Sequence, residues 1–445
     1  MKVPFISNQR GQVLPLTLVL LVATASIVFY MFNTGQLVQE KIRLTNTADA
    51  VAYSAGVYEA RVLNYDAYTN RAMIANEIAI GQAVGLASWA KYAGVSADNI
   101  SQWAQYIPYI GPYVKTTLQA IKDVMEATLF SLSASVVAHD GAIQVLKASQ
   151  YAVHGPSNSV ALFNRKVVMD EVAKQNDADV HVDLVPISDN FSSFTKRYEK
   201  DERARMRDVV EQNRQQEDFL KARRWNFKFG ICVKPFGGFR IDFKKRGGTA
   251  LIGLDGWKSI DTLSAHVRTG HKCRRRERPI GYGSSLSEDD LSNNYDAYNQ
   301  SRSTNPRATS RALSSAGIAW DSAPLSIAGG AIPEFYDLSS EALEQEDPRT
   351  QITIRVTKPN DKQRYSGGSS VVKPSGSLDL YGGEHQMDVT ASIARAEVYF
   401  ERPDGANKQY NKAELGSLFN PYWQVHLVPV SVAERAKAAL LQGFN

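Results

Sequence analysis

The chain has 445 residues, of which 43% are hydrophobic and 22% are charged. These values are typical of a folded protein and exclude both a mainly disordered chain and a membrane protein with many spans. The 51 Lys and Arg residues exceed the 46 Asp and Glu residues by only five, which does not favour a protein devoted to nucleic acid.

The first predicted element is a membrane span. Val13–Phe32 is a run of twenty residues without a charged side chain. A helix of this length covers roughly 30 Å, the thickness of the hydrocarbon core, whereas the apolar part of a signal peptide has about 7 to 15 residues. We therefore predict a retained transmembrane helix at 13–32. Lys and Arg are equally frequent on its two flanks, so the orientation depends on the terminal amine and on the absence of a further span. We expect residues 1–12 in the cytoplasm and the remainder on the other side.

A helical region is predicted to follow, from 33 to 224. Over residues 36–90, apolar side chains spaced three and four apart define one helix face. Small residues on this face would let another helix approach closely. The face either contacts another subunit or packs on the chain's own next helices. We name it the helix interaction face; its members are Leu37, Leu44, Ala48, Val51, Ala55, Tyr58, Val62, Tyr65 and Ala72.

Polar side chains interrupt the apolar pattern between positions 64 and 77, and they need hydrogen-bond partners if they are buried. We expect a structural role for them. Further helices are predicted at 113–151, 157–175 and 194–224, and the short loops between them imply antiparallel packing. The polar residues are Asn64, Asp66, Asn70, Arg71, Asn76 and Glu77.

From 225 to 430 the sequence predicts a β-rich region. Trp225, Phe227 and Phe229 begin an alternating pattern that resumes after Gly237-Gly238, which indicates a β-hairpin. Further strands are predicted at 351–357, 396–401 and 423–429, loops at 281–315 and 366–376, and a short helix within 431–445. The predicted fold class is therefore α+β: a transmembrane helix that continues into a long amphipathic helix and a helical bundle, then a mainly antiparallel β-rich region.

The two cysteines, Cys232 and Cys273, form a candidate disulfide if this part of the chain lies in an oxidising compartment, and two buried thiols are the alternative. His266 and His271 lie near Cys273, but a zinc site there would need a fourth ligand from elsewhere. We find no phosphate-binding loop, no nucleophile motif and no catalytic constellation. We therefore predict no metal, no cofactor and no enzymatic activity.

One local excess of positive charge is interleaved with the aromatic residues of the predicted hairpin. Basic side chains beside aromatic rings can hold single-stranded nucleic acid or an acidic polymer. In half-buried strands, however, the aromatic side chains would face the core and the lysines would face water. Both interpretations stay open. The residues are Lys228, Lys234, Arg240, Lys244, Lys245, Arg246, Arg274, Arg275 and Arg276.

Gln9-Arg10-Gly11-Gln12 before the span and Leu44-Thr45-Asn46-Thr47-Ala48-Asp49-Ala50-Val51-Ala52 after it resemble the amino terminus of TadE/TadG-like Flp (Tad) pilus-assembly proteins. Residues 67–77 and the tail Leu418-Phe419-Asn420-Pro421-Tyr422-Trp423 resemble larger members of that group. The resemblance implies a single-pass protein of the bacterial inner membrane with its carboxyl-terminal bulk in the periplasm. Such a protein helps to assemble or anchor Flp pili, a branch of type IV pili used for attachment.

The implied partners are the membrane, other Tad/Flp or pilin-like subunits and further copies of the chain; nucleic acid is not favoured. Leu16 stands where a processed pilin-like protein would carry Glu, so we expect an uncleaved anchor. The metal motif of the von Willebrand factor A domain, which some relatives carry, is not found. The leading hypothesis is a non-enzymatic, membrane-anchored assembly component. The alternative is a periplasmic binding module whose basic aromatic sheet holds DNA or an acidic envelope polymer.

Overall fold

The computed structural model describes residues 13–288, 305–308, 325–364, 389–402 and 415–442. Long helices and mainly antiparallel sheets make up these residues, which confirms the predicted α+β class. The chain divides into two compact units. The first unit joins residues 1–65, 153–196 and 338–445, and the second joins 66–152 and 197–337. Each unit therefore combines helices and strands from distant parts of the sequence. The predicted division of the chain into a helical region up to residue 224 and a β-rich region after it stays a prediction.

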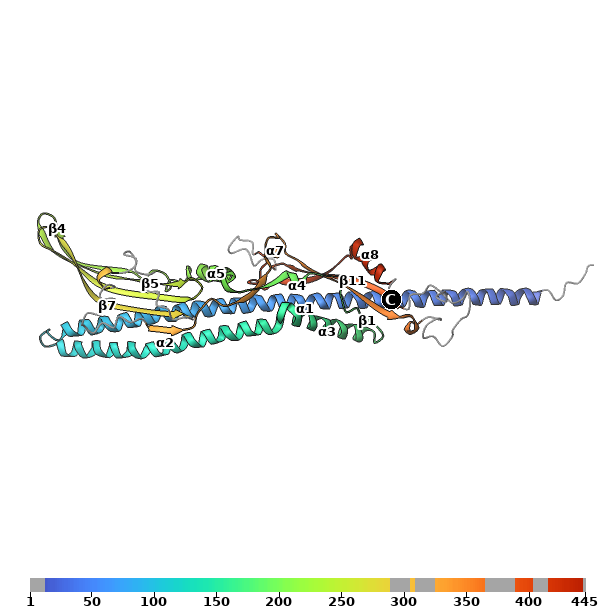
Figure 1. The fold of residues 1–445 in the computed structure, drawn as a ribbon, viewed down its shortest axis with the longest axis horizontal. Helices are drawn as coiled ribbons and strands as arrows, with labels where there is room; N and C mark the ends of the chain where they lie inside the picture. The colour runs from blue at the N-terminus through green and yellow to red at the C-terminus, as the bar shows by residue number, and fades with distance from the viewer. Residues whose placement is uncertain (1–12, 289–304, 309–324, 365–388, 403–414, 443–445) are drawn as a thin grey trace, which may run out of the picture. The chain divides into compact units, whose positions relative to one another are not determined.

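The helices begin with α1, Val13–Ala104, a single element of 92 residues (Figure 1). No proline falls between Pro15 and Pro108, so nothing in this stretch removes a backbone donor from the helix. The next helices are α2 (Gly111–His154) and α3 (Ser159–Asn176), separated by the short 3-10 helix η1 (Pro156–Asn158). The helices predicted at 36–90, 113–151 and 157–175 are thus confirmed.

The helix predicted over 194–224 is mostly wrong. This stretch holds strand β3 (Thr195–Tyr198), a 3-10 helix η2 (Lys200–Arg203) and only one longer helix, α5 (Ala204–Arg214). Its charged residues do not all lie on a solvated helix. Arg205 pairs with the buried Asp337 of strand β9 (Phe335–Leu338), which also pairs with β3. Tertiary contacts therefore override the local helical pattern.

The first unit contains a sheet of order β1–β10–β11–β12, with β2 also pairing to β10. All of these pairings are antiparallel. Strands predicted at 351–357, 396–401 and 423–429 correspond to β10, β11 and β12. The helix predicted near the carboxyl end is α8 (Val432–Gln442). The strand bounds are β1 His181–Val182, β2 Ser188–Asp189, β10 Thr350–Pro359, β11 Val389–Phe400 and β12 Trp423–Val428; two short helices are α4 Phe191–Phe194 and α7 Ser340–Leu343.

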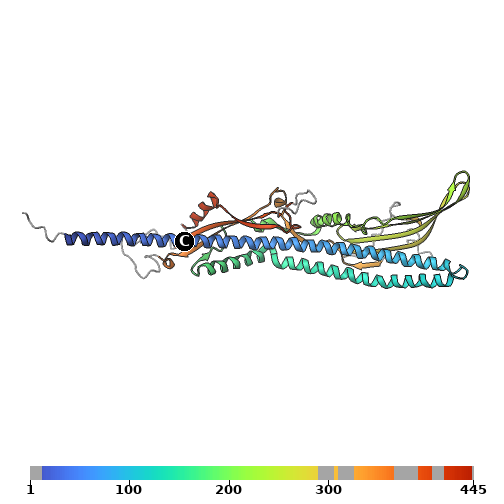
Figure 2. The same cartoon turned by 180° about the vertical axis from the view of Figure 1, so that it is seen from behind.

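The second unit contains a sheet of order β4–β5–β6–β7–β8. The first four strands are antiparallel, and β8 runs parallel to β7. Within this unit, the later part of α1 lies beside both the sheet and α2 (Figure 2). The predicted hairpin is confirmed as β4 and β5. The bounds are β4 Trp225–Val233, β5 Gly237–Ile252, β6 Gly256–Thr269, β7 Arg274–Glu288 and β8 Leu325–Ala328.

Part of the loop predicted at 281–315 is instead a buried strand. Residues 281–288 form the end of β7, and all eight are buried. A Cβ atom on Gly283 would lie 2.1 Å from the carbonyl oxygen of Ser88 in α1, so the strand and the helix backbone are in direct contact. Glycine is needed for that approach. The residues that indicated a loop therefore allow the strand to pack closely on the helix. The predicted loops at 289–304, 309–315 and 366–376 and the predicted cytoplasmic residues 1–12 lie outside the described residues.

Candidate functional site

The first feature with functional meaning is the exposed apolar start of α1. Its most apolar window has a mean hydropathy of 2.3 and is not buried by any of the residues that the structure describes. Leu14 is 74% exposed and Met31 is 68% exposed. Such a surface requires an apolar surrounding, so this stretch is a candidate membrane span. A second stretch, Gly111–Asn176, also meets the criteria of length and composition, with a lower mean hydropathy of 1.3.

The helix interaction face is occupied by the chain itself in the first unit. Ala48, Val51 and Ala55 are fully buried in a core that includes Ile354 of β10 and Ala396 of β11. The same core contains Met169 and Ala173 of α3. The small side chains therefore admit the chain's own sheet and α3, which is the own-chain alternative that the sequence left open.

The remaining members of this face follow the same pattern. Leu44 is buried in the same core, and Val62 is buried in a neighbouring core formed with Phe191 and Trp423. Leu37, Tyr58, Tyr65 and Ala72 are half-buried. The buried members of the helix interaction face therefore pack on the chain itself. Their main partner is a sheet, whereas the sequence indicated the chain's next helices.

A buried ion cluster fixes α1 to β10 shortly after the span. The Lys358 ammonium donates hydrogen bonds of 2.9 Å to the carboxylates of Glu40 and Asp177. All three side chains are at least nine-tenths buried, and Arg43 lies 3.7 Å from Asp177. Burial lowers the pKa of Lys358, but its hydrogen bonds to Asp177 and Glu40 outweigh this and raise the pKa overall. Lys358 therefore stays charged and ties the helix to the sheet.

A second buried cluster lies further along α1. The guanidinium of Arg165 in α3 binds Glu59 of α1 and Asp189 of β2. Glu59 is completely buried, and this burial raises its pKa to about 7 although the charge of Arg165 acts in the opposite direction. Neither this cluster nor Lys358 was predicted. Arg165 lies 106 residues from Glu59 and Lys358 lies 318 residues from Glu40, and no local motif marks these pairs.

The polar residues between 64 and 77 connect elements, as expected for a structural role. In the first unit, Asn64 donates to the carbonyl oxygen of Trp423 and accepts from its backbone N–H. In the second unit, Asn70 donates to the carbonyl oxygen of Tyr336, Asn76 pairs with His139, and the indole N–H of Trp257 donates to Glu77. These contacts satisfy buried polar groups on a helix that is packed on several sides. Gln150 of α2 adds hydrogen bonds to Asn70 and to the backbone of Asp66.

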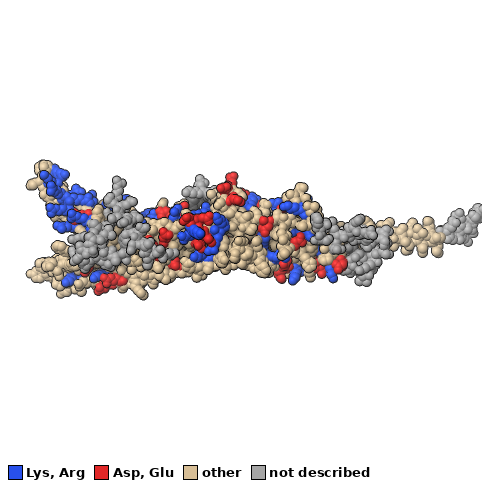
Figure 3. Space-filling view, in the orientation of Figure 1, with Lys and Arg blue, Asp and Glu red and all other residues tan. Residues whose placement is uncertain are grey.

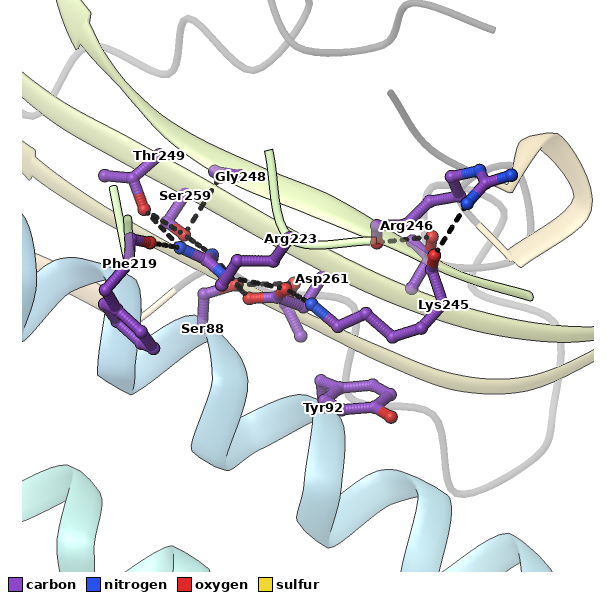
Figure 4. A network of polar contacts seen from close by, with 12 residues as sticks. Ser88, Tyr92, Phe219, Arg223, Lys245, Arg246, Gly248, Thr249, Ser259 and Asp261 are labelled. Carbon is purple, nitrogen blue, oxygen red and sulfur yellow. Dashed lines mark hydrogen bonds and ion pairs between the residues drawn. The ribbon is translucent and has the colours of Figure 1, made fainter. Parts of the chain in front are cut away.

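In the second unit, Asp261 of β6 is the centre of a buried polar network (Figure 4). It accepts hydrogen bonds from Ser88 of α1 at 2.8 Å and from Arg223 at 2.7 Å. Lys245 of β5 also pairs with it, and the Lys245 ammonium lies 5.4 Å from the ring centre of Tyr92. Burial, and secondarily the charge of Asp261, raises the pKa of Tyr92 to about 12. The network holds α1 against the sheet and presents no reacting group to solvent.

This network corrects the predicted basic surface at one residue. Lys245 is 3% exposed and faces α1, because its position in β5 places it on the helix side of the sheet. Arg240, Lys244 and Arg246 are half-buried, and Arg240 pairs with Asp242. The exposed members are Lys228, Lys234, Arg274, Arg275 and Arg276.

The aromatic side chains of the hairpin do not face a core. Phe227 is 58% exposed, Phe229 62% and Ile231 77%. The interpretation of a half-buried strand with its rings in the core is therefore wrong for β4. This strand is the edge of its sheet, and the described residues place no element over its outer part. Cys232 and Cys273 form a disulfide that joins the end of β4 to the β6–β7 turn.

Neither His266 nor His271 takes part in a metal site among the described residues, which contain no group of three or more His, Cys, Asp or Glu arranged to hold an ion. His266 is buried and contacts Arg275 and Asn305, and Cys273 is in the disulfide. Burial lowers the pKa of His266. His266 and Cys273 therefore have structural partners.

The observations define a class of protein: a chain whose first helix is a candidate membrane span and then serves as a core helix of two α+β units. Residues 11–60 match the family described as putative Flp pilus-assembly TadE/G-like. The predicted resemblance is thereby confirmed over the matched residues, which comprise the candidate span and the part of α1 that enters the first unit. No curated protein and no solved structure matches the chain.

Proposed function

We propose that this protein is a membrane-anchored, non-enzymatic component of a Tad/Flp pilus-assembly apparatus. The match of residues 11–60 carries the proposal, because these residues include both the exposed apolar stretch and the start of the buried helix. The structure adds a physical reason. Two buried ion clusters connect α1 to β10, to α3 and to β2 of the first unit, so the candidate span continues directly into a helix that is held within a folded unit.

The surfaces available for partner subunits differ from the predicted helix interaction face. Buried alanines such as Ala48 contribute to the core, whereas the span and α2 present apolar side chains outward. On α2, Phe130 is 81% exposed, Val137 58% and Val145 68%. Exposed apolar residues on a helix are natural contacts for the helices of pilin-like subunits, in the membrane through the span and outside it through α2.

We further propose a single-pass topology in the bacterial inner membrane, with the amino terminus in the cytoplasm and both units in the periplasm. The Cys232–Cys273 disulfide supports this location, because the periplasm is oxidising and the cytoplasm is reducing. An uncleaved amino-terminal anchor is part of the same proposal.

The proposal is tested by placing a photo-crosslinking amino acid at single positions of the full chain in living cells. Leu18 in the span and Phe130 on α2 are the exposed positions, and Ala48 is the matched buried control. We expect crosslinks to pilus components from the two exposed positions and only intramolecular products from Ala48. Crosslinks to pilus components from none of the exposed positions would contradict a role in assembly through these helices.

A further inference from the structure

The outer ends of strands β4 to β7 expose apolar side chains that a soluble domain normally buries. We define the stapled tip as residues 225–240 and 267–276. The Cys232–Cys273 disulfide joins these two segments, from the end of β4 to the β6–β7 turn. In addition to the exposed Phe229 and Ile231, Phe236 in the first turn is 85% exposed. Phe227, Phe229 and Ile231 lie directly across from Phe243, Ile241 and Phe239 of β5, so the side chains share one face. Contiguous exposed apolar surface of this kind marks an interaction site.

The same tip is strongly basic. Its two segments contain eight Lys and Arg residues and no Asp or Glu. Arg240 and Arg268 contact Asp242, which lies just inside the tip, whereas Lys228, Lys234 and Arg274 are exposed. Figure 3 shows Lys and Arg side chains gathered at this end of the sheet. Charge complementarity therefore requires an anionic partner.

Among anionic partners, the exposed aliphatic side chains favour a bilayer. Nucleic acid is held by phosphate contacts and by stacking on aromatic rings, and Ile231 and Val233 have no ring to offer. A phospholipid surface presents phosphates to the lysines and arginines and an apolar layer to the aliphatic and aromatic side chains. The disulfide keeps both turns together, which limits the conformational cost of insertion.

A second group of exposed side chains points to the same partner. The end of α1 exposes Trp103 by 79%, and the turn between α1 and α2 exposes Tyr106 by 77% and Tyr109 by 97%. Tyr113, at the start of α2, is 78% exposed. Trp and Tyr are the residues enriched where a protein meets the headgroup layer. Within the second unit, this turn lies at the same end as the stapled tip (Figures 1 and 2).

We propose that this end of the second unit docks on an anionic phospholipid bilayer, through the stapled tip and the α1–α2 turn and independently of the span at 13–32. The proposal goes beyond the role in pilus assembly and does not depend on it. The hairpin inserts apolar side chains into the outer layer of the bilayer, and the surrounding basic residues bind lipid phosphates.

The test uses the full chain in nanodiscs of phosphatidylcholine. The nanodisc surrounds the span with lipid and leaves the two units accessible. The nanodiscs are mixed with sucrose-loaded vesicles of phosphatidylcholine alone or with phosphatidylglycerol, and the protein that sediments with the vesicles is measured at several salt concentrations. We expect sedimentation only with phosphatidylglycerol, decreasing as salt is raised. Replacing two charges, Lys228→Gln with Lys234→Gln, should weaken binding by about thirtyfold.

The apolar contribution is tested with Phe229→Ser combined with Ile231→Ser, which should weaken binding by more than about tenfold. Phe130→Ser on α2 is the control, because it removes an apolar side chain of similar exposure away from the tip and should leave binding unchanged. All of these side chains are exposed, so the variants should unfold at the same temperature as the original chain.

Three results would overturn the proposal: equal binding to both kinds of vesicle, no binding to either, or an unchanged affinity in both double variants. An added single-stranded oligonucleotide or an acidic protein that binds the tip more tightly than the anionic vesicles would assign the surface to that other partner.

Discussion

The buried ion cluster next to the span gives the sharpest energetic prediction. In Lys358→Met, the carboxylates of Glu40 and Asp177 lose a partner 2.9 Å away while both remain at least nine-tenths buried. Breaking a buried ion pair from one side costs about 3–5 kcal/mol. Asp177 retains Arg43 at 3.7 Å and accepts a hydrogen bond of 3.1 Å from the backbone N–H of Asp179, whereas Glu40 retains the exposed Arg364 at 3.9 Å. Most of the loss therefore falls on Glu40, and we expect about 3 kcal/mol.

The assay is hydrogen exchange of the full chain in nanodiscs, measured by mass spectrometry on peptides of β10 and β11. A loss of about 3 kcal/mol corresponds to roughly hundredfold faster exchange of the protected amides. Lys166→Met is the matched control, because Lys166 pairs with the half-exposed Asp170 on one helix face and its loss should cost no more than about 0.5 kcal/mol.

A second variant separates charge from packing. Adding Glu40→Leu to Lys358→Met removes the buried carboxylate that has lost its lysine partner. This double variant should regain part of the protection from hydrogen exchange. If Lys358→Met changes exchange in β10 by less than about threefold, the cluster does not fix α1 to the sheet and the argument fails.

Two further predictions concern the packing of α1. Gly283→Ala should lower the unfolding temperature of the full chain, because its Cβ would lie 2.1 Å from the Ser88 carbonyl oxygen. Gly141→Ala on α2 is the control: its Cβ would have nothing within 4 Å, so it should raise stability by about 0.5–1 kcal/mol. Equal effects of the two variants in calorimetry would contradict the close approach of β7 and α1. The pKa of Glu59, raised by burial from 4.5 to about 7, means that the folded state binds the proton more tightly, so this residue lowers stability as the pH rises from 4.5 to 7. Glu59→Gln should therefore reduce that pH-dependent loss in thermal unfolding, and parallel curves for the two proteins would refute the assignment.

The sequence predicts α1, α2 and α3 well because their signals are local, whereas the charged stretch 194–224 is mostly not helical. Apolar spacing and the absence of proline are sufficient for α1, and the polar residues Asn64 and Asn70 are correctly expected to be structural. The prediction at 281–288 is wrong, because the sequence indicated a loop and the structure has a strand. There the Gly and Ser residues that are typical of loops allow a strand to touch a helix backbone, a reason that only the fold reveals.

The interaction surfaces were harder to predict because exposure depends on which element covers which face. Alternation in β4 predicted a hairpin correctly, but it could not reveal that Phe227 and Phe229 lie on an edge strand beyond the cover of α1. Conversely, Lys245 has a pattern typical of a surface, and the apolar face that includes Ala48 could have contacted another subunit, yet distant segments bury both residues. Partners such as Asp261 and Ser88 are 173 residues apart, and no sequence motif links them.

The central claim, a role in pilus assembly, is tested most directly by electron microscopy of surface pili. A strain that lacks this gene is compared with one that carries the full chain and with one that carries Lys358→Met. Our account predicts loss of pili in the deletion strain, recovery with the full chain and reduced recovery with the variant, because the span is then less firmly joined to the first unit. Normal piliation in the deletion strain would contradict the account.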